Sequence, residues 1–305
     1  AGNNGHVVGS LQELEALPDL ENAIIVAQTT QNTLFFDSVT NWAATHHPHY
    51  KVFNTICDST ERRQAEVKRL AESVDAVIVV GGRSSGNTRR LVEIARETGA
   101  SVTPIVADHA SDEGREKILS VCPQPDILVG TCSPAPFTQD FREVTVAQWQ
   151  EHLALGLISP IEFMRATIDG MCERGFGRIV NISTGAAKYP AEIRTLSGPP
   201  RAALTNYTVA AAKAVARHNV TINNLLPGMH HTAAAEERLG QIARERGGSY
   251  DEVVQDWINE WRIPAEKFGN IDDFGAICAL FCSAQANYIV GQNLVIDGGA
   301  TNSTF

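Results

Sequence analysis

The residues best suited to bind a negatively charged group lie in a glycine-rich turn over 81–88. The turn is Gly81-Gly82-Arg83-Ser84-Ser85-Gly86-Asn87-Thr88, between an apolar run and a helical pattern. Backbone N–H groups at the start of a helix, with hydroxyl groups and a guanidinium, can bind phosphate or another anion. The turn follows neither the GxGxxG nor the Walker pattern. An anion site and an ordinary strand-to-helix turn are therefore equal alternatives.

A second group of polar residues follows the strongest strand signals. Ser183 ends the β-branched run 179–182, and Pro227-Gly228 ends the apolar run 220–226. A small-residue helical segment lies between them, so the pattern predicts a right-handed strand–helix–strand crossover. Ligands in parallel sheets bind beyond the carboxyl ends of the strands. We therefore expect Ser183, the loop 184–200 and Pro227-Gly228 at any active site.

The elements that must position these residues alternate along the chain. Apolar runs predict strands at 23–27, 51–56, 75–80, 102–106, 127–129, 179–183, 220–226 and 293–296. Helical patterns occupy 34–46, 61–73, 89–98, 111–120, 144–173 (with a bend expected at Pro160), 201–216 and 272–283. This alternation predicts an α/β fold: a doubly wound, mainly parallel sheet in a Rossmann-like three-layer αβα sandwich.

A charged helical segment over about 232–262 interrupts the alternation. We expect it to form a helical lid over the strand ends; a plain surface insertion is the alternative.

Composition narrows the classes of partner. The 305 residues are 43% hydrophobic and 20% charged, and the net charge of −10 argues against a nucleic-acid or anionic membrane surface. No run is long and apolar enough to span a membrane. Six cysteines without a CxxC pair suit a reducing compartment. We therefore expect a cytoplasmic protein with a small-molecule ligand, without nucleic-acid or membrane partners.

Residues from about 101 to 299 resemble the later part of a classical short-chain dehydrogenase/reductase. The matching pieces, in family order, are Val106-Ala107-Asp108, Asp126-Ile127-Leu128-Val129, Gly177-Arg178-Ile179-Val180-Asn181-Ile182-Ser183, Asn223-Asn224-Leu225-Leu226-Pro227-Gly228 and Gly291-Gln292-Asn293-Leu294-Val295-Ile296-Asp297-Gly298-Gly299. The resemblance implies an NAD(P)-dependent oxidoreductase with Asp108, Pro227 and Gly228 at the cofactor. It also implies that Ser183 polarises a carbonyl by hydrogen bonding. The family is often tetrameric, and the apolar stripes of 144–173 and 201–217 allow a homo-oligomer.

Several positions that function in this family differ here. The family places a Tyr about 13 residues after the Ser and a Lys four residues later; this chain has Leu196 and Ser197, then Arg201. Gly156 stands where the family has a helical Asn, and the turn 28–33 lacks the family's glycines. We therefore expect an oxidoreductase-like protein with impaired or absent activity. Ser183 with Arg201 and no glycine cradle also resembles halohydrin dehalogenases, which use a Ser-Tyr-Arg set and bind no nucleotide.

Residues from about 5 to 100 resemble one lobe of the LytB family, the iron–sulfur reductases of hydroxymethylbutenyl diphosphate. The resemblance is carried by Ala27-Gln28-Thr29-Thr30, by the run from Asn54 to Gln64, and by the run from Val79 to Leu91. It implies that Thr29, Thr30, Ser84, Ser85 and Asn87 contact a diphosphate and that Cys57 is one of three cluster ligands. One cysteine cannot hold a cubane cluster, so we expect no iron–sulfur cluster and regard Cys57 as a weak metal candidate.

The two resemblances meet near Gly99-Ala100-Ser101. We predict a single Rossmann-like domain over 1–305, built from segments 1–100 and 101–305 as a chimera of two α/β folds. Two other functions stay open: an engineered or recombined scaffold without catalytic activity, and a small-anion or diphosphate binder that uses the LytB-like loops.

Overall fold

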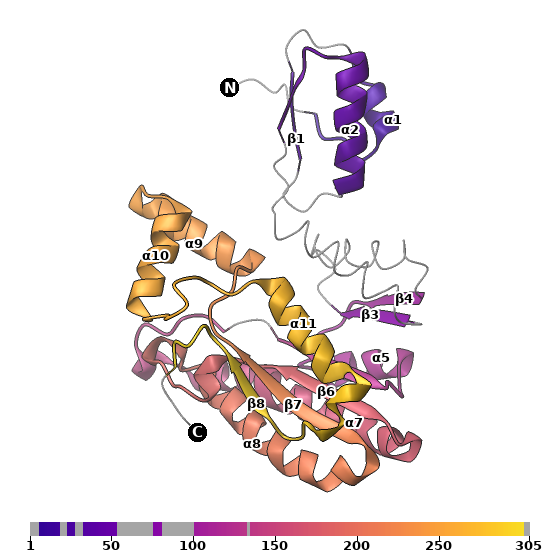
Figure 1. Cartoon of the computed structure of the whole chain (residues 1–305), viewed down its shortest axis with the longest axis vertical. Helices are drawn as coiled ribbons and strands as arrows, with labels where there is room; N and C mark the ends of the chain where they lie inside the picture. The colour runs from indigo at the N-terminus through magenta and orange to yellow at the C-terminus, as the bar shows by residue number, and fades with distance from the viewer. Residues whose placement is uncertain are drawn as a thin grey trace. The chain divides into compact units, whose positions relative to one another are not determined.

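The computed structural model describes residues 6–18, 23–27, 33–53, 76–80, 101–132 and 135–301 (Figure 1). The chain divides into two compact units, Ala1–Val106 and Ala107–Phe305, and each is described by itself. The expected assembly of both segments into one domain stays a prediction.

The first unit contains two pairs of parallel strands. Its described elements are α1 (Leu11–Glu15), β1 (Ile24–Val26), α2 (Thr33–His46), β2 (Lys51–Phe53), β3 (Ala76–Val80) and β4 (Ser101–Ile105). Strand β1 pairs with β2, and β3 pairs with β4. Helix α2 buries Phe36, Val39 and Ala43, because residues three and seven apart lie on one helical face. The helices predicted at 61–73 and 89–98 lie outside the described residues.

The second unit holds the longer run of alternating elements. They are α5 (Asp112–Val121), β5 (Ile127–Gly130), η1 (Phe141–Glu143), α6 (Val146–Leu153), η2 (Ala154–Ile158), α7 (Ser159–Arg174), β6 (Gly177–Ile182), η3 (Gly185–Ala187), η4 (Glu192–Arg194), α8 (Gly198–Val215), η5 (Ala216–His218), β7 (Val220–Pro227), α9 (Ala233–Arg246), α10 (Tyr250–Glu260), α11 (Ile271–Cys282), η6 (Ala284–Tyr288) and β8 (Asn293–Ile296). None of the helices in the described ranges has both the length and the apolar character needed to cross a membrane.

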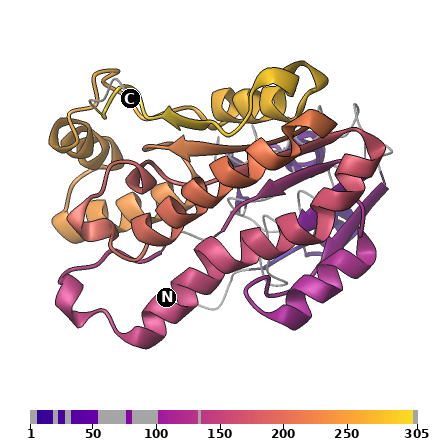
Figure 2. The ribbon, with the colours of Figure 1, turned by 90° about the horizontal axis from the view of Figure 1, so that it is seen from below.

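Four strands of this unit form one parallel sheet in the order β5-β6-β7-β8. Alternate residues of a strand face opposite sides of a sheet. Ile179 therefore packs with α7 and α8 on one side, whereas Val180 packs with Phe281 of α11 on the other. Figures 1 and 2 show α7 and α8 on one face of the sheet and α11 on the other. The predicted α/β fold with a mainly parallel sheet is confirmed.

The two central strands bury polar as well as apolar side chains. Asn224 is fully buried and accepts a hydrogen bond from Asn181 Nδ2 at 3.0 Å. Its own Nδ2 donates to Asn293 Oδ1 at 2.6 Å. This amide ladder links β6, β7 and β8 and satisfies groups that burial would otherwise leave without partners.

The long helical region predicted at 144–173 is interrupted, as its proline suggested. Helix α6 runs into the π-helical turn η2, and Pro160 stands at the start of α7. A proline has no N–H group to bond the carbonyl four residues earlier, which is that of Gly156. The irregular turn therefore lies just before the proline rather than at it.

The segment predicted as a helical lid forms two helices with a core of their own. Leu239 and Ala243 of α9 pack with Val253, Trp257 and Ile258 of α10. Gly247 has a left-handed backbone, φ +70°, and ends α9. The helices are confirmed, and a lid movement stays a prediction.

Candidate functional site

Ser183 lies directly beyond the carboxyl end of β6. Its N–H donates to the carbonyl oxygen of Leu225 at 2.8 Å, which continues the pairing of β6 with β7. Its hydroxyl is buried and has no hydrogen-bond partner within the described part of the chain. A buried hydroxyl without a partner is uncommon, and here it occurs where a sheet of this kind binds ligands.

Three hydrogen bonds to described residues hold Arg201 at the start of α8. Its Nη1 donates to the backbone oxygen and to the hydroxyl of Ser197, both at 3.1 Å. Its Nη2 donates to Cys132 Sγ at 2.7 Å. The side chain is only 6% exposed. Arg201 therefore joins α8 to the segment that follows β5.

Gly156 explains how α8 comes so close to the π-helical turn. A Cβ on Gly156 would lie 3.2 Å from Pro200 Cβ and 3.8 Å from Arg201 Cγ. The family resemblance expects an Asn at this position, but Pro200 and Arg201 of α8 occupy the space beside Gly156 that a longer side chain would need. Gly156 thus faces the start of α8, where Pro200 and Arg201 lie.

Of the predicted cofactor residues, Pro227 is the last residue of β7 and Gly228 directly follows the strand. Gly228 N donates to Ile296 O at 2.9 Å, and a Cβ on Gly228 would lie 2.6 Å from Asp297 Cβ. Packing against Asp297 alone therefore requires glycine here. A Cβ on Gly185 would lie 3.5 Å from Pro227 O. The structure thus brings the turns after β6 and β7 together.

Asp108 occupies a turn that starts α5. Its Oδ1 accepts a hydrogen bond from Ala110 N at 3.0 Å, and its backbone oxygen accepts one from the Ser111 hydroxyl at 2.9 Å. No hydrogen bond between described residues links Asp108 to Ser183 or Arg201. Its predicted cofactor role stays a prediction.

The other predicted site residues lie outside the described residues. They are Thr29, Thr30, Cys57, Ser84, Ser85 and Asn87, with the whole glycine-rich turn 81–88. Across the ranges that are described, no three His, Cys, Asp or Glu side chains gather as metal ligands. The diphosphate and metal predictions for this part therefore stay predictions.

The tyrosines near the site do not take the place of the family's Tyr. Tyr207 packs into the core cluster under α7 and α8. The ring of Tyr189 lies 5.6 Å from Lys188 Nζ. Leu196 and Ser197, which stand where the Tyr is expected, are each 3% exposed.

The sequence analysis missed a cluster of cations beside this site. Arg194 of η4 and Arg238 of α9 lie over the ring of Phe137, with Cζ-to-centroid distances of 4.4 and 3.4 Å. Burial lowers the pKa of Arg194 to about 10, with smaller contributions from Arg238 and Arg201. No local motif marks these residues, because they come from three separate segments.

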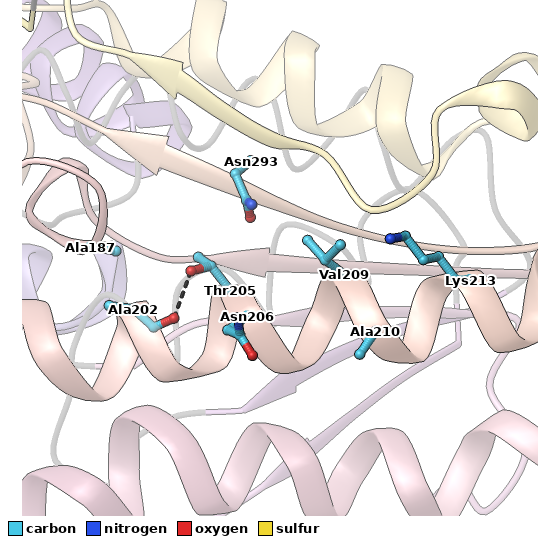
Figure 3. A pocket seen from close by; sticks show the side chains of 8 residues that line it. All are labelled: Ala187, Ala202, Thr205, Asn206, Val209, Ala210, Lys213 and Asn293. Carbon is cyan, nitrogen blue, oxygen red and sulfur yellow. Dashed lines mark hydrogen bonds between the residues drawn. The ribbon is translucent and has the colours of Figure 1, made fainter. Parts of the chain in front are cut away.

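A shallow groove of about 490 Å³ runs along α8 (Figure 3). It is lined by Ala187, Ala202, Thr205, Asn206, Val209, Ala210, Lys213 and Asn293. The Thr205 hydroxyl is bonded to Ala202 O at 2.7 Å, as the dashed line shows. Apart from Ala187 in the loop 184–200, no predicted site residue lines the groove, so the strand-end residues remain the candidate site.

The fold of the second unit is that of Rossmann-like proteins, and the solved structures it resembles include reductases of the short-chain dehydrogenase/reductase type. L-sorbose reductase from Gluconobacter frateurii superimposes with a TM-score of 0.71 at 22% identity, over 79% of this chain and 92% of that one. YwfH, an NADPH-dependent reductase, gives 0.68 at 23% identity, over 79% and 94%. At these identities the likeness shows the fold.

Relatives by sequence bear out both resemblances. Mouse dehydrogenase/reductase SDR family member 4 is 29% identical over 244 residues, 77% of this chain and 81% of that protein. The LytB protein family matches residues 1–135. The 4-hydroxy-3-methylbut-2-enyl diphosphate reductase of Oleidesulfovibrio alaskensis is 46% identical over 102 residues. The chain thus joins a region that resembles short-chain dehydrogenase/reductases to one that resembles LytB.

The two resemblances overlap along the chain. The LytB match reaches residue 135, and the dehydrogenase match covers 77% of the chain, so together they exceed its length. The LytB-like match spans only 36% of the Oleidesulfovibrio reductase.

Proposed function

We propose that the protein is an oxidoreductase-like member of the short-chain dehydrogenase/reductase type that binds NAD(P), with impaired hydride transfer. The names of its relatives support the cofactor. One is called a dehydrogenase/reductase, and the L-sorbose reductase structure is described as complexed with NADPH and L-sorbose. The ligand site is the region beyond the carboxyl ends of β5, β6 and β7.

The observation that carries this proposal is the buried Ser183 hydroxyl without a partner. An unsatisfied buried hydroxyl costs about 1–3 kcal/mol, which a ligand oxygen would recover. The hydroxyl follows β6, beside the Pro227-Gly228 turn, and suits hydrogen bonding to a carbonyl or carboxamide oxygen. These residues fit the polar end of a nicotinamide cofactor and its substrate. When bound, the cofactor would supply the hydride, and Ser183 would orient the accepting carbonyl.

Ser197 accounts for the impairment. Leu196 and Ser197 stand where the family's Tyr is expected; only Ser197 carries a hydroxyl, and its side chain is shorter by an aromatic ring. An aliphatic hydroxyl is also a weaker acid than a phenol, whose pKa is about 10. Moreover, the Ser197 oxygen already accepts a hydrogen bond from Arg201. The Ser197 hydroxyl is therefore a poor proton donor to the alkoxide that forms when a carbonyl is reduced.

Two other functions predict different results. A recombined scaffold without activity would bind no dinucleotide. A diphosphate binder that uses the LytB-like loops would bind pyrophosphate through Thr29, Ser84, Ser85 and Asn87. The expected homo-oligomer and cytoplasmic location also stay predictions.

Fluorescence titration with NADH and NADPH tests the proposal. We expect saturable binding below millimolar cofactor, with slow or no oxidation of the bound cofactor when L-sorbose or another carbonyl compound is added. Absence of binding at millimolar cofactor would contradict the proposal and favour the scaffold. Fast turnover that Ser183→Ala abolishes would contradict the impairment.

A further inference from the structure

Phe137 lies between two guanidinium groups. Arg194 Cζ is 4.4 Å and Arg238 Cζ is 3.4 Å from the centroid of the Phe137 ring. One ring face cannot hold two planar guanidinium groups at these distances, so we place them on opposite faces. Phe137 also contacts Trp257 of α10, with ring centroids 5.9 Å apart. The ring therefore joins η4 to the helical pair α9–α10.

Neither of these arginines has an ion-pair partner in the described ranges. Other arginines of the same unit do: Arg165 pairs with Glu162, Arg174 with Asp126, and Arg246 with Asp256. The chain carries a net charge of −10. Acidic side chains are therefore in excess, and a shortage of them does not explain why these two arginines lack ion-pair partners. Cation–π contacts stabilise such groups only modestly.

The surroundings of Arg194 disfavour its positive charge, for which the described residues supply no ion-pair partner. Burial is the main cause that lowers its pKa to about 10, and the charges of Arg238 and Arg201 lower it further. Burial also lowers the pKa of Arg238. Three cations thus come near one another from η4, α8 and α9, and a bound anion would relieve their repulsion.

Thr138 gives a second, independent observation. Its N–H donates to Ile193 O at 3.0 Å, which ties it to the residue before Arg194. Its side-chain hydroxyl is buried without a partner within the described part of the chain, and the residue is 7% exposed. Thr138 is thus bonded through its backbone to the neighbour of Arg194, and it directly follows Phe137, the ring on which both arginines lie.

We propose that Arg194, Arg238 and Thr138 form a site for the oxyanion group, carboxylate or phosphate, of a small-molecule ligand. Guanidinium groups bind such oxyanions through paired, charge-assisted hydrogen bonds. Arg194 belongs to the loop 184–200, which directly follows Ser183. Resting on the proposed function, the inference gives the substrate class: a carbonyl compound that carries an acidic group.

Arginine modification on the unaltered full-length chain provides the first test. Phenylglyoxal modifies accessible arginines, and mass spectrometry reports the extent at each one. We expect malonate or inorganic phosphate to protect Arg194 and Arg238 but not Arg244, an exposed arginine of the same helix α9. Equal protection of all three, or of none, would overturn the proposal.

Calorimetric titration of variants with malonate, phosphate and pyrophosphate provides the second test. We expect Arg238→Gln and Arg194→Gln each to weaken binding of the preferred anion roughly tenfold or more. Arg244→Gln, which makes the same change of charge, should leave it unchanged. The preferred anion distinguishes a carboxylate from a phosphate ligand. Undiminished binding in both folded variants would overturn the proposal.

Both tests omit the nicotinamide cofactor, so their outcome is separate from that of the proposed function. Anion binding without NADPH binding would keep the site and reject the oxidoreductase. NADPH binding without anion binding at Arg194 and Arg238 would support the oxidoreductase and reject the anion site.

Discussion

The guanidinium of Arg201 donates to the hydroxyl of Ser197 at 3.1 Å, across one turn at the start of α8. The two residues stand four apart, at the spacing that the family resemblance gives to its Tyr and Lys. The pair thus retains a donor–acceptor contact at that spacing. What it lacks is the aromatic ring that would carry an acidic hydroxyl towards a substrate.

Replacing Ser197 by Ala should destabilise the protein. The change removes an acceptor from a guanidinium that is 6% exposed, and an unmet buried donor costs about 1–3 kcal/mol. Urea denaturation measures the free energy of unfolding. Thr195→Ala is the control: its hydroxyl bond to Glu192 O is solvent-exposed, and we expect a change below about 0.5 kcal/mol. Equal losses in the two variants would contradict the structural role of the Ser197–Arg201 contact.

Ser197→Tyr combined with Arg201→Lys should raise carbonyl reduction. The double change restores a phenol and an ammonium at the family spacing, and a positioned proton donor contributes roughly 10²–10⁴-fold to rate. The measurement is NADPH oxidation with a carbonyl substrate. The matched control is Ser197→Phe with Arg201→Lys, which adds the ring without its hydroxyl. If the Tyr variant folds and binds NADPH but is no faster than the Phe variant, the explanation of the impairment is wrong.

Asn224→Ala should be among the more destabilising single changes in the sheet. Asn224 is fully buried and bonded to both Asn181 and Asn293. The substitution leaves their amides without a partner and opens a cavity, so we expect a loss of about 2–4 kcal/mol. Chemical denaturation followed by circular dichroism measures it. Asn206→Ala, on the exposed side of α8 (Figure 3), should change stability little; a comparable loss there would count against the amide ladder.

Stability should fall on acidification because of His230. Burial is the main cause that lowers its pKa below the ordinary 6.5, and the nearby His231 acts in the same direction, whereas the Gly228 carbonyl opposes them. The unfolded chain therefore binds the proton more readily than the folded chain. The contribution of His230 to the free energy of unfolding is complete above about pH 6.5. It is lost as the pH falls towards the lower pKa that His230 has in the folded protein.

His230→Gln should flatten this dependence. The measurement compares the free energy of unfolding at about pH 7.5 and about pH 5.5 in the wild type and the variant. His109, whose pKa burial also lowers, continues to contribute, so part of the slope should persist. An unchanged slope in His230→Gln would show that His230 does not cause the acid sensitivity.

Local sequence patterns were sufficient to predict the sheet of the second unit. Strands β6 and β7 are buried along nearly their whole length, so their apolar, β-branched runs predict them without reference to the other elements. Pro160 likewise indicated the interruption of the long helix, because the cause is in the proline itself. The helical character of 232–262 was also evident from its composition.

Contacts between distant segments could not be predicted in the same way. Phe137 and Arg238 are far apart in the sequence, and a half-buried arginine resembles any surface arginine until its neighbours are known. The sulfur of Cys132 accepts a hydrogen bond from Arg201, 69 residues later in the chain, and no local pattern indicates this contact. The missing hydroxyl partner of Ser183 is visible only once the surrounding atoms are in place.

The central claim is that a nicotinamide dinucleotide binds beyond the carboxyl ends of the β5–β8 sheet. A difference electron-density map from crystals grown with NADPH tests it most directly. We predict density for the dinucleotide over these strand ends, with its nicotinamide near the Ser183 hydroxyl. Density confined to the glycine-rich turn 81–88, or no density for the dinucleotide anywhere, would contradict the claim.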